Sequence, residues 1–192
     1  ASAVVGSQTL MATPVIITVT GTPIPEDWVT ANFVSLYASG ATPRLMTGIA
    51  SVESSYKQFE MRTLYKYPGY WPTESHQDGG SHIGLMMVST SLALKNAWSW
   101  RENSMEGVTE FVRDKLSAAS RVMNKYIKSH AGLRKLTGVE LEKMALVYYG
   151  PYGAKGPYYL PAQQGSGWTW VKNASGNPNG VAYADSVRSM MK

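Results

Sequence analysis

The sequence of 192 residues contains no cysteine, only three His and three Phe, and only 16% charged residues. The absence of cysteine excludes a disulfide framework, a cysteine nucleophile and a thiolate metal site. No apolar run approaches the ~20 residues that a membrane-spanning helix needs. The histidines show no metal-ligand spacing, and P-loop, GxGxxG, HExxH and EF-hand patterns are missing. We therefore expect neither a metal nor a cofactor.

Basic residues are missing from the N-terminal part of the chain. All 18 Lys and Arg lie at or after Arg44, and the net charge of the chain is +5. A basic domain suits a polyanionic partner such as nucleic acid, an anionic membrane or bacterial cell wall. The basic residues of 101–143 alternate with Glu instead of forming a stripe, as on a solvated helix face. We therefore expect no nucleic-acid partner.

The rest of the composition is that of a folded domain. Hydrophobic residues make up 44% and aromatic residues 11%, in a chain long enough for one domain. Residues 1–25 carry no charge, lack the basic start of a signal peptide, and do not begin with Met. We interpret 1–25 as a linker or packed arm, with a strand at 14–20, and 26–192 as the folded domain. The chain then looks like an excised fragment or a processed form.

Helical signals dominate after Pro25, which predicts a mainly α fold. Thr42-Pro43 is a helix start, and Thr137 with Glu140 resembles a capping box. Apolar residues recur at helical spacing over 104–129. The predicted helices cover 27–38, 43–59, 90–98, 104–129, 137–149 and 183–191. Residues 62–82 and 150–182 are rich in Gly, Pro and aromatics and are predicted to be long irregular loops.

Glu53 is the residue that needs an explanation. It lies on the same helical face as Met46, Ile49 and Ala50. An unpaired carboxylate on an apolar face costs free energy, and burial raises its pKa. A carboxyl group with a raised pKa can serve as a general acid near neutral pH. The alternative is a structural Glu that pairs with an Arg or a backbone group.

Three short segments resemble a known superfamily in their order and helical placement. They are Glu53-Ser54, the stretch GLMMV at 84–88 and the stretch ALVYYG at 145–150. Over residues 43–153 the chain resembles soluble lytic transglycosylases and goose-type lysozymes, of the lysozyme-like superfamily. These carry a catalytic Glu followed by Ser, then Gly-Leu-Met-Gln, then Ala-Tyr-Asn-x-Gly. The resemblance implies a lysozyme-like helical domain with long irregular loops.

The resemblance implies that Glu53 donates a proton to a glycosidic oxygen. Goose-type lysozymes carry an Asp where this chain has Asp78, six residues before Gly84. A second carboxylate that positions water favours hydrolysis, whereas lytic transglycosylases reuse the single acid and release 1,6-anhydro products. The alternative for Asp78 is a turn residue held by the glycines that follow it. Glu60 and Glu74 are reserve carboxylates.

Substrate contacts are implied for five residues of the three segments. Ser54 and Met86 match the pattern, Met87 replaces its usual Gln, and Tyr149 replaces its usual Asn. Tyr148 corresponds to a Tyr that contacts the acid or an acetamido sugar, although an interior Tyr fits the spacing equally well. Aromatic residues in the two long loops would flank a sugar groove, or would pack those loops as a minor core: Tyr65, Tyr67, Tyr70, Trp71, Tyr152, Tyr158, Tyr159, Trp168 and Trp170.

The implied activity is that of a peptidoglycan muramidase. Such an enzyme cleaves the β-1,4 bond between N-acetylmuramic acid and N-acetylglucosamine. The alternatives are a lytic transglycosylase, a non-catalytic glycan-binding domain and a chitin-directed enzyme. The implied partner is the peptidoglycan strand, and the implied place of action is the bacterial periplasm or cell wall, reached by export, injection or lysis. A phage lysin and a secreted antibacterial effector both fit, and an effector would imply an immunity protein as partner.

Overall fold

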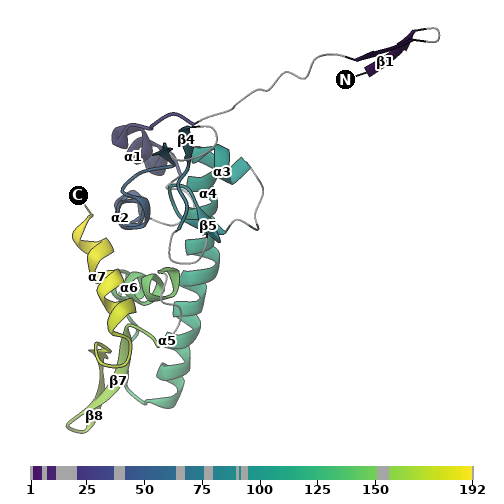
Figure 1. The fold of residues 1–192 in the computed structure, drawn as a ribbon. Coiled ribbons are helices and arrows are strands. Elements are labelled where there is room, and N and C mark those ends of the chain that lie inside the picture. The colour runs from purple at the N-terminus through teal and green to yellow at the C-terminus, as the bar shows by residue number, and fades with distance from the viewer. Residues whose placement is uncertain are drawn as a thin grey trace.

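Helices form most of the molecule, as expected for a mainly α fold. The computed structural model describes residues 2–5, 8–11, 21–36, 42–63, 68–75, 80–89, 91, 95–150 and 156–191. The helices are α1 (Glu26–Ser35), α2 (Pro43–Ser54), α3 (Lys95–Trp98), α4 (Trp100–Glu110), the π-helix η2 (Phe111–Leu116), α5 (Ser117–Ser129), α6 (Gly138–Tyr149) and α7 (Pro178–Ser189). In Figure 1, α4 and α5 run through the length of the helical body.

Helix α2 carries Glu53 and ends earlier than predicted. Thr42 caps it by accepting a hydrogen bond from the backbone N–H of Leu45, and Pro43 is its first residue. The predicted end at 59 is wrong because Ser55 and Tyr56 adopt positive φ angles of 52° and 63°. Left-handed residues cannot continue a right-handed helix. Glu53 therefore lies in the last turn of α2, beside the chain reversal.

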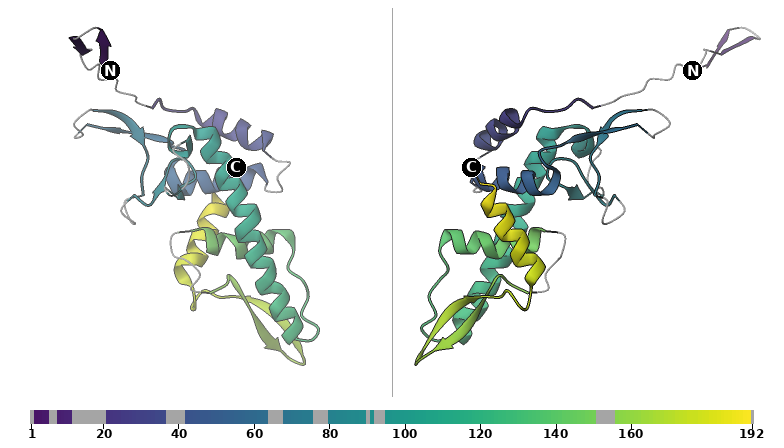
Figure 2. Two further views of the ribbon diagram at one scale, coloured as in Figure 1. Left: turned by 90° about the vertical axis from the view of Figure 1, so that its right-hand side faces the viewer. Right: turned by 60° about the vertical axis from the view of Figure 1, so that its left-hand side comes forward.

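The long helix predicted over 104–129 is present as three consecutive segments. Helix α4, the π-helix η2 and α5 follow one another without a break from Trp100 to Ser129. A π-helix adds a residue to the turn and shifts the faces of the helix that follows it. In both views of Figure 2 this long element crosses α6, which contacts η2 and α5.

The two C-terminal helices begin at strong caps. The capping box of Thr137 and Glu140 is confirmed at the start of α6. Helix α7 begins at Pro178 and not near 183, because the Asn177 side chain accepts a hydrogen bond from the Gly180 N–H and Pro178 occupies the first helical position. The prediction missed this start by about one turn.

The regions predicted as irregular loops contain antiparallel hairpins, which corrects that expectation. Strand β3 (Phe59–Arg62) pairs with β4 (Gly69–Pro72), β5 (His82–Ile83) with β6 (Val88–Ser89), and β7 (Tyr159–Gln164) with β8 (Gly167–Lys172). Gly165, with φ of 61°, supplies the turn between β7 and β8. Near the N-terminus, β1 (Ser2–Val5) pairs with β2 (Gln8–Met11), and this hairpin lies away from the helical body in both figures. The strand expected at 14–20 lies outside the described residues.

One hydrophobic core joins α1, α2, η2, α6 and α7. Gly48 of α2 allows a close approach to α7, since a Cβ atom there would lie 2.6 Å from the carbonyl oxygen of Val187. The fully buried centre of the core comprises Val29, Phe33, Leu45, Ile49, Leu85, Met86, Phe111, Met144 and Leu146. This packing fixes the C-terminal end of α2 against α7. In the described part of the chain, no helix is long and apolar enough to cross a membrane.

Candidate functional site

Glu53 meets a tyrosine that the sequence analysis did not identify. The hydroxyl of Tyr183, in the middle of α7, donates a hydrogen bond to Glu53 Oε1. Gly150, directly after α6, makes room for the Tyr183 ring, because a Cβ atom at 150 would lie 2.7 Å from the ring. The packing of α7 on α2 and α6 thus holds a neutral hydrogen-bond donor against the carboxyl group. No local sequence pattern near Tyr183 indicates this role.

The pKa of Glu53 is raised from 4.5 to about 7. Burial is the largest cause, because it penalises the charged form, and the charge of Glu110 raises the pKa further. The Tyr183 hydrogen bond and the charge of His82 act in the opposite direction. No Lys or Arg forms an ion pair with Glu53 in the described part of the chain. Near neutral pH the carboxyl group is therefore present in both its protonated and its ionised form.

The three segments that the sequence analysis singled out, Glu53-Ser54, 84–88 and 145–150, meet beside Glu53. Ser54 Oγ lies 2.8 Å from the carbonyl oxygen of Leu85 and accepts a hydrogen bond from the N–H of Lys57. The hydroxyl of Tyr149 donates to the carbonyl oxygen of Met86 at 2.8 Å. Segments 31 and 63 residues apart in the chain are therefore joined directly by hydrogen bonds.

Two buried amide side chains hold the turn at 84–87 in place. Gln58 Oε1 accepts from the N–H of Leu85 at 2.9 Å, and Asn103 Oδ1 accepts from the N–H of Met86 at 2.7 Å. Their amide nitrogens donate to backbone carbonyls of Asn96 and its neighbours. Gly84 has φ of 82°, and a Cβ atom there would collide with both amides. These hydrogen bonds satisfy the buried polar groups of the turn and hold its backbone in one conformation.

The residues expected to contact substrate differ in exposure. Ser54 is buried, and its hydroxyl is engaged in the contacts described above. Met86 is completely buried and its side chain packs on Gly107 of α4. Both side chains therefore have packing positions rather than open faces. Met87 is only partly buried and has φ of 47°, so its side chain is turned out of the core relative to that of Met86.

Tyr148 and Tyr149 point to different surroundings. The Tyr149 hydroxyl lies inside, and burial together with the charges of Glu53 and Glu110 raises its pKa well above 10. Its ring lies 6.0 Å from that of Phe111. Tyr148 is half-buried, and its pKa is raised by burial and by Tyr126. The tyrosine whose hydroxyl bonds to Glu53 is Tyr183, from another helix, and the contact of Tyr148 with the acid or with a sugar stays a prediction.

Second carboxylates near Glu53 are limited in number. Asp78 lies outside the described residues. Glu60 and Glu74 both form ion pairs with Arg62 of β3, at 2.7 Å and 3.1 Å. Glu110, the last residue of α4, pairs with Lys115 at 2.8 Å, and its charge raises the pKa of Glu53. The sequence analysis did not identify Glu110, whose nearness depends on how α4 packs beside α2.

Several aromatic residues of the predicted groove belong to the core instead. Tyr158 is 2% exposed, and Trp170 is buried with its indole N–H donating to the carbonyl of Arg134. Trp168 packs edge-on against His130 at the end of α5. The β7–β8 hairpin lies at the far end of the body from α2 (Figure 1). Tyr70 and Trp71 lie in β4, and three of the other loop aromatics lie outside the described residues: Tyr65, Tyr67 and Tyr152.

The described residues contain no group of three or more His, Cys, Asp or Glu side chains placed to hold a metal ion. Around Glu53, the raised pKa and the hydrogen bond from Tyr183 fit the carboxyl group for proton transfer. No protein-family model matches the chain, and comparison with curated proteins and with solved structures likewise gives no match.

Proposed function

We propose that the protein is a lysozyme-like muramidase that cleaves the β-1,4 bond between N-acetylmuramic acid and N-acetylglucosamine in peptidoglycan. The observation that carries the proposal is the environment of Glu53. Burial raises the pKa of this carboxyl to about 7, and its hydrogen-bond partner is the neutral Tyr183. A general acid works best when its pKa lies near the working pH.

The chemistry follows from the protonation state of Glu53. The protonated carboxyl donates to the glycosidic oxygen while positive charge develops on the sugar ring. Tyr183 fixes the orientation of Oε1, so the other carboxyl oxygen is the one that carries the proton to the substrate. The turn at 84–87 adjoins the acid through Ser54, and its partly exposed residue Met87 is the one that we propose to contact the sugar.

Hydrolysis needs a second carboxylate that positions water on the opposite face of the sugar. Asp78 is the residue that the sequence resemblance offers for this role, and Glu110 is the carboxylate whose charge acts on Glu53 in the structure. We propose hydrolysis with one of these two residues. The lysozyme-like resemblance is supported by the way in which its three segments meet beside Glu53.

A lytic transglycosylase is the second candidate. It is favoured by one observation: burial raises the pKa of Glu53 to about 7, so this carboxyl can give up a proton and take one back near neutral pH. A single carboxyl group that acts first as acid and then as base suffices for intramolecular attack by the 6-hydroxyl of the sugar. In either case the protein would act in the bacterial periplasm or cell wall.

Mass spectrometry of digested peptidoglycan tests the proposal. The Glu53→Gln variant is expected to lose at least about 100-fold in rate, because general acid catalysis contributes 10² to 10⁴. Asp185→Asn is the matched control. Asp185 also accepts a tyrosine hydrogen bond, but it lies on α7, whereas Glu53 lies on α2. Reducing-end products support hydrolysis, and anhydro products, lighter by one water, support transglycosylation. Three results would overturn the muramidase assignment. The first is unchanged cleavage by Glu53→Gln. The others are a wild-type protein that binds peptidoglycan without cleaving it and one that cleaves chitin but not peptidoglycan.

A further inference from the structure

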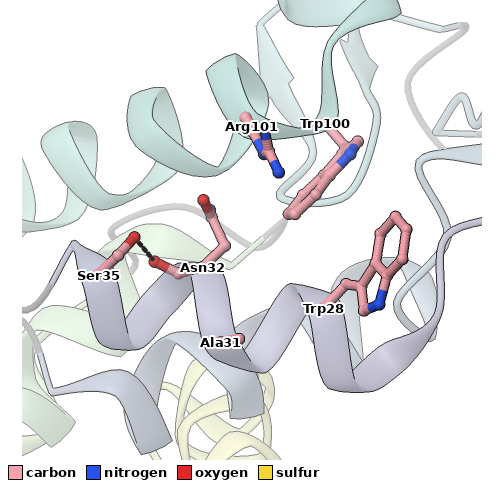
Figure 3. A pocket seen from close by; sticks show the side chains of 6 residues that line it. All are labelled: Trp28, Ala31, Asn32, Ser35, Trp100 and Arg101. Carbon is pink, nitrogen blue, oxygen red and sulfur yellow. Dashed lines mark hydrogen bonds between the residues drawn. The ribbon is translucent and has the colours of Figure 1, made fainter.

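A pocket of about 460 Å³ lies between α1 and the beginning of α4. Figure 3 shows the indole rings of Trp28 and Trp100 flanking the same space, with Arg101 and Asn32 beside them. Trp28 is 59% exposed, so its ring is accessible from the solvent. The pocket is distinct from the Glu53 region, because ten residues of helix, about 15 Å, separate Trp100 from Glu110.

The charged group of this pocket is a hydrogen-bond donor. The guanidinium of Arg101 lies 5.2 Å from the ring centre of Trp100, and no carboxylate pairs with it in the described chain. Its neighbour Glu102 is already paired with Lys95 at 2.7 Å. The Asn32 amide nitrogen is buried and has no hydrogen-bond partner among the described residues. A buried donor without a partner costs free energy unless a ligand or water supplies an acceptor.

Among the described residues that line the pocket, the remaining side chain with a hydroxyl or amide group is already engaged. The Ser35 hydroxyl donates to the carbonyl of Asn32 at 2.6 Å. The two acidic residues at the start of α1, Glu26 and Asp27, do not line the pocket. The pocket therefore combines one positive charge and unused donors with two flat apolar rings. A complementary ligand brings negative charge, acceptor oxygens and a flat apolar face of its own.

We propose that this pocket binds a sugar that carries a carboxylate. The indole rings suit the apolar face of a pyranose ring, and the Arg101 fork suits the carboxylate. The choice of a sugar over other carboxylates rests on the proposed function. The carboxylate comes either from the sugar itself or from a peptide attached to it. The pocket would then hold a part of the glycan that is not being cleaved.

An NMR titration of the six tryptophan indole N–H signals tests this inference. Trp28→Phe and Trp100→Phe assign the two signals of interest. N-acetylmuramic acid carries its carboxylate on the sugar, muramyl dipeptide carries it on the peptide, and N-acetylglucosamine has none. We expect at least one of the two acidic ligands to shift the Trp28 and Trp100 signals, with an affinity at least about tenfold above that of N-acetylglucosamine. The tighter of the two acidic ligands identifies the source of the carboxylate.

Variants at Arg101 test the charge. Arg101→Gln is expected to remove the tenfold preference for the acidic ligands, and Arg101→Lys to retain part of it. Arg113→Gln is the matched control, because Arg113 is an exposed arginine paired with Asp114 on the following π-helix. Equal binding of N-acetylglucosamine, equal binding of the unattached dipeptide, or shifts confined to the other four indoles would overturn the inference.

The Glu53→Gln variant separates this inference from the proposed function. It is expected to keep the shifts of the Trp28 and Trp100 signals while it loses cleavage. Cleavage that survives in this variant, together with intact ligand binding, would remove the muramidase assignment and leave the pocket standing. Loss of cleavage with no ligand-induced shift at either indole would remove the pocket inference and leave the muramidase assignment standing.

Discussion

Two carboxyl groups of this protein accept a hydrogen bond from a tyrosine, yet their pKa values move in opposite directions. Glu53 accepts from Tyr183 of α7, and its pKa rises to about 7. Asp185, also on α7, accepts from Tyr158 at 2.7 Å, and its pKa is lowered. The two pairs are close relatives in chemistry, and α7 supplies one member of each, so the tyrosine does not decide the direction.

The two pKa values move in opposite directions because lysine side chains lie beside Asp185 and not beside Glu53 in the described part of the chain. Burial by itself would raise the pKa of Asp185, but Lys172 Nζ lies 2.5 Å from Oδ2 and Lys143 Nζ lies 4.0 Å from Oδ1. These charges and the Tyr158 hydrogen bond outweigh the burial. Glu53 has no such partner among the described residues, and the charge of Glu110 adds to its burial. Glu53 becomes a usable acid because its burial outweighs the Tyr183 hydrogen bond and the charge of His82, and no Lys or Arg pairs with it in the described part of the chain.

The largest expected effect is on the pH dependence of stability at Glu53. Because the folded-state pKa is raised from 4.5 to about 7, the protonated form favours folding below pH 4.5, and this stability is lost as the pH rises through 7. Relative to Glu53→Gln, the wild type should lose on the order of 3 kcal/mol of unfolding free energy over this range. Urea unfolding of both proteins at a series of pH values measures the difference. A constant difference would mean that Glu53 titrates normally.

Asp185→Asn is expected to show a smaller effect of opposite sign. A lowered folded-state pKa adds stability above the ordinary value of 3.8, and this stability is lost as the pH falls through the folded-state value. The side chain is 39% exposed, so solvent screening limits the loss in the variant to about 1 kcal/mol at neutral pH. The same urea series measures it. A loss that persists undiminished in strong acid would have to come from packing.

The smallest effects concern the tyrosines themselves. Tyr183→Phe removes a hydrogen bond that lowers the pKa of Glu53, so this pKa should rise and the alkaline limit of activity should move to higher pH. Tyr158→Phe should also raise the pKa of Asp185, but leave the pH profile of activity unchanged. Each variant should cost about 1 kcal/mol of stability. Carboxyl-carbon NMR titrations follow both groups, and an unshifted Glu53 in Tyr183→Phe would break the comparison.

Helix starts that carry a local sequence signal were predicted correctly. Features without such a signal were missed. Thr42-Pro43 and the Thr137–Glu140 capping box gave correct helix starts, because caps satisfy backbone groups within a few residues. The β7–β8 hairpin was missed, since its composition of Gly, Pro and aromatics is typical of loops as well. The end of α2 was missed because Ser55 and Tyr56 are not residues that favour positive φ.

The sequence by itself determined that the fold is mainly α and that Glu53 is an acid on an apolar helix face. Both follow from helical periodicity and from the cost of burying a charge. Only the tertiary structure decided that Tyr183 and Glu110 act on Glu53 and that Lys172 lies beside Asp185. These partners come from separate helices and strands, so their distances depend on how α2, α4 and α7 pack. A pKa depends on the charges that packing brings near, and sequence spacing does not contain that information.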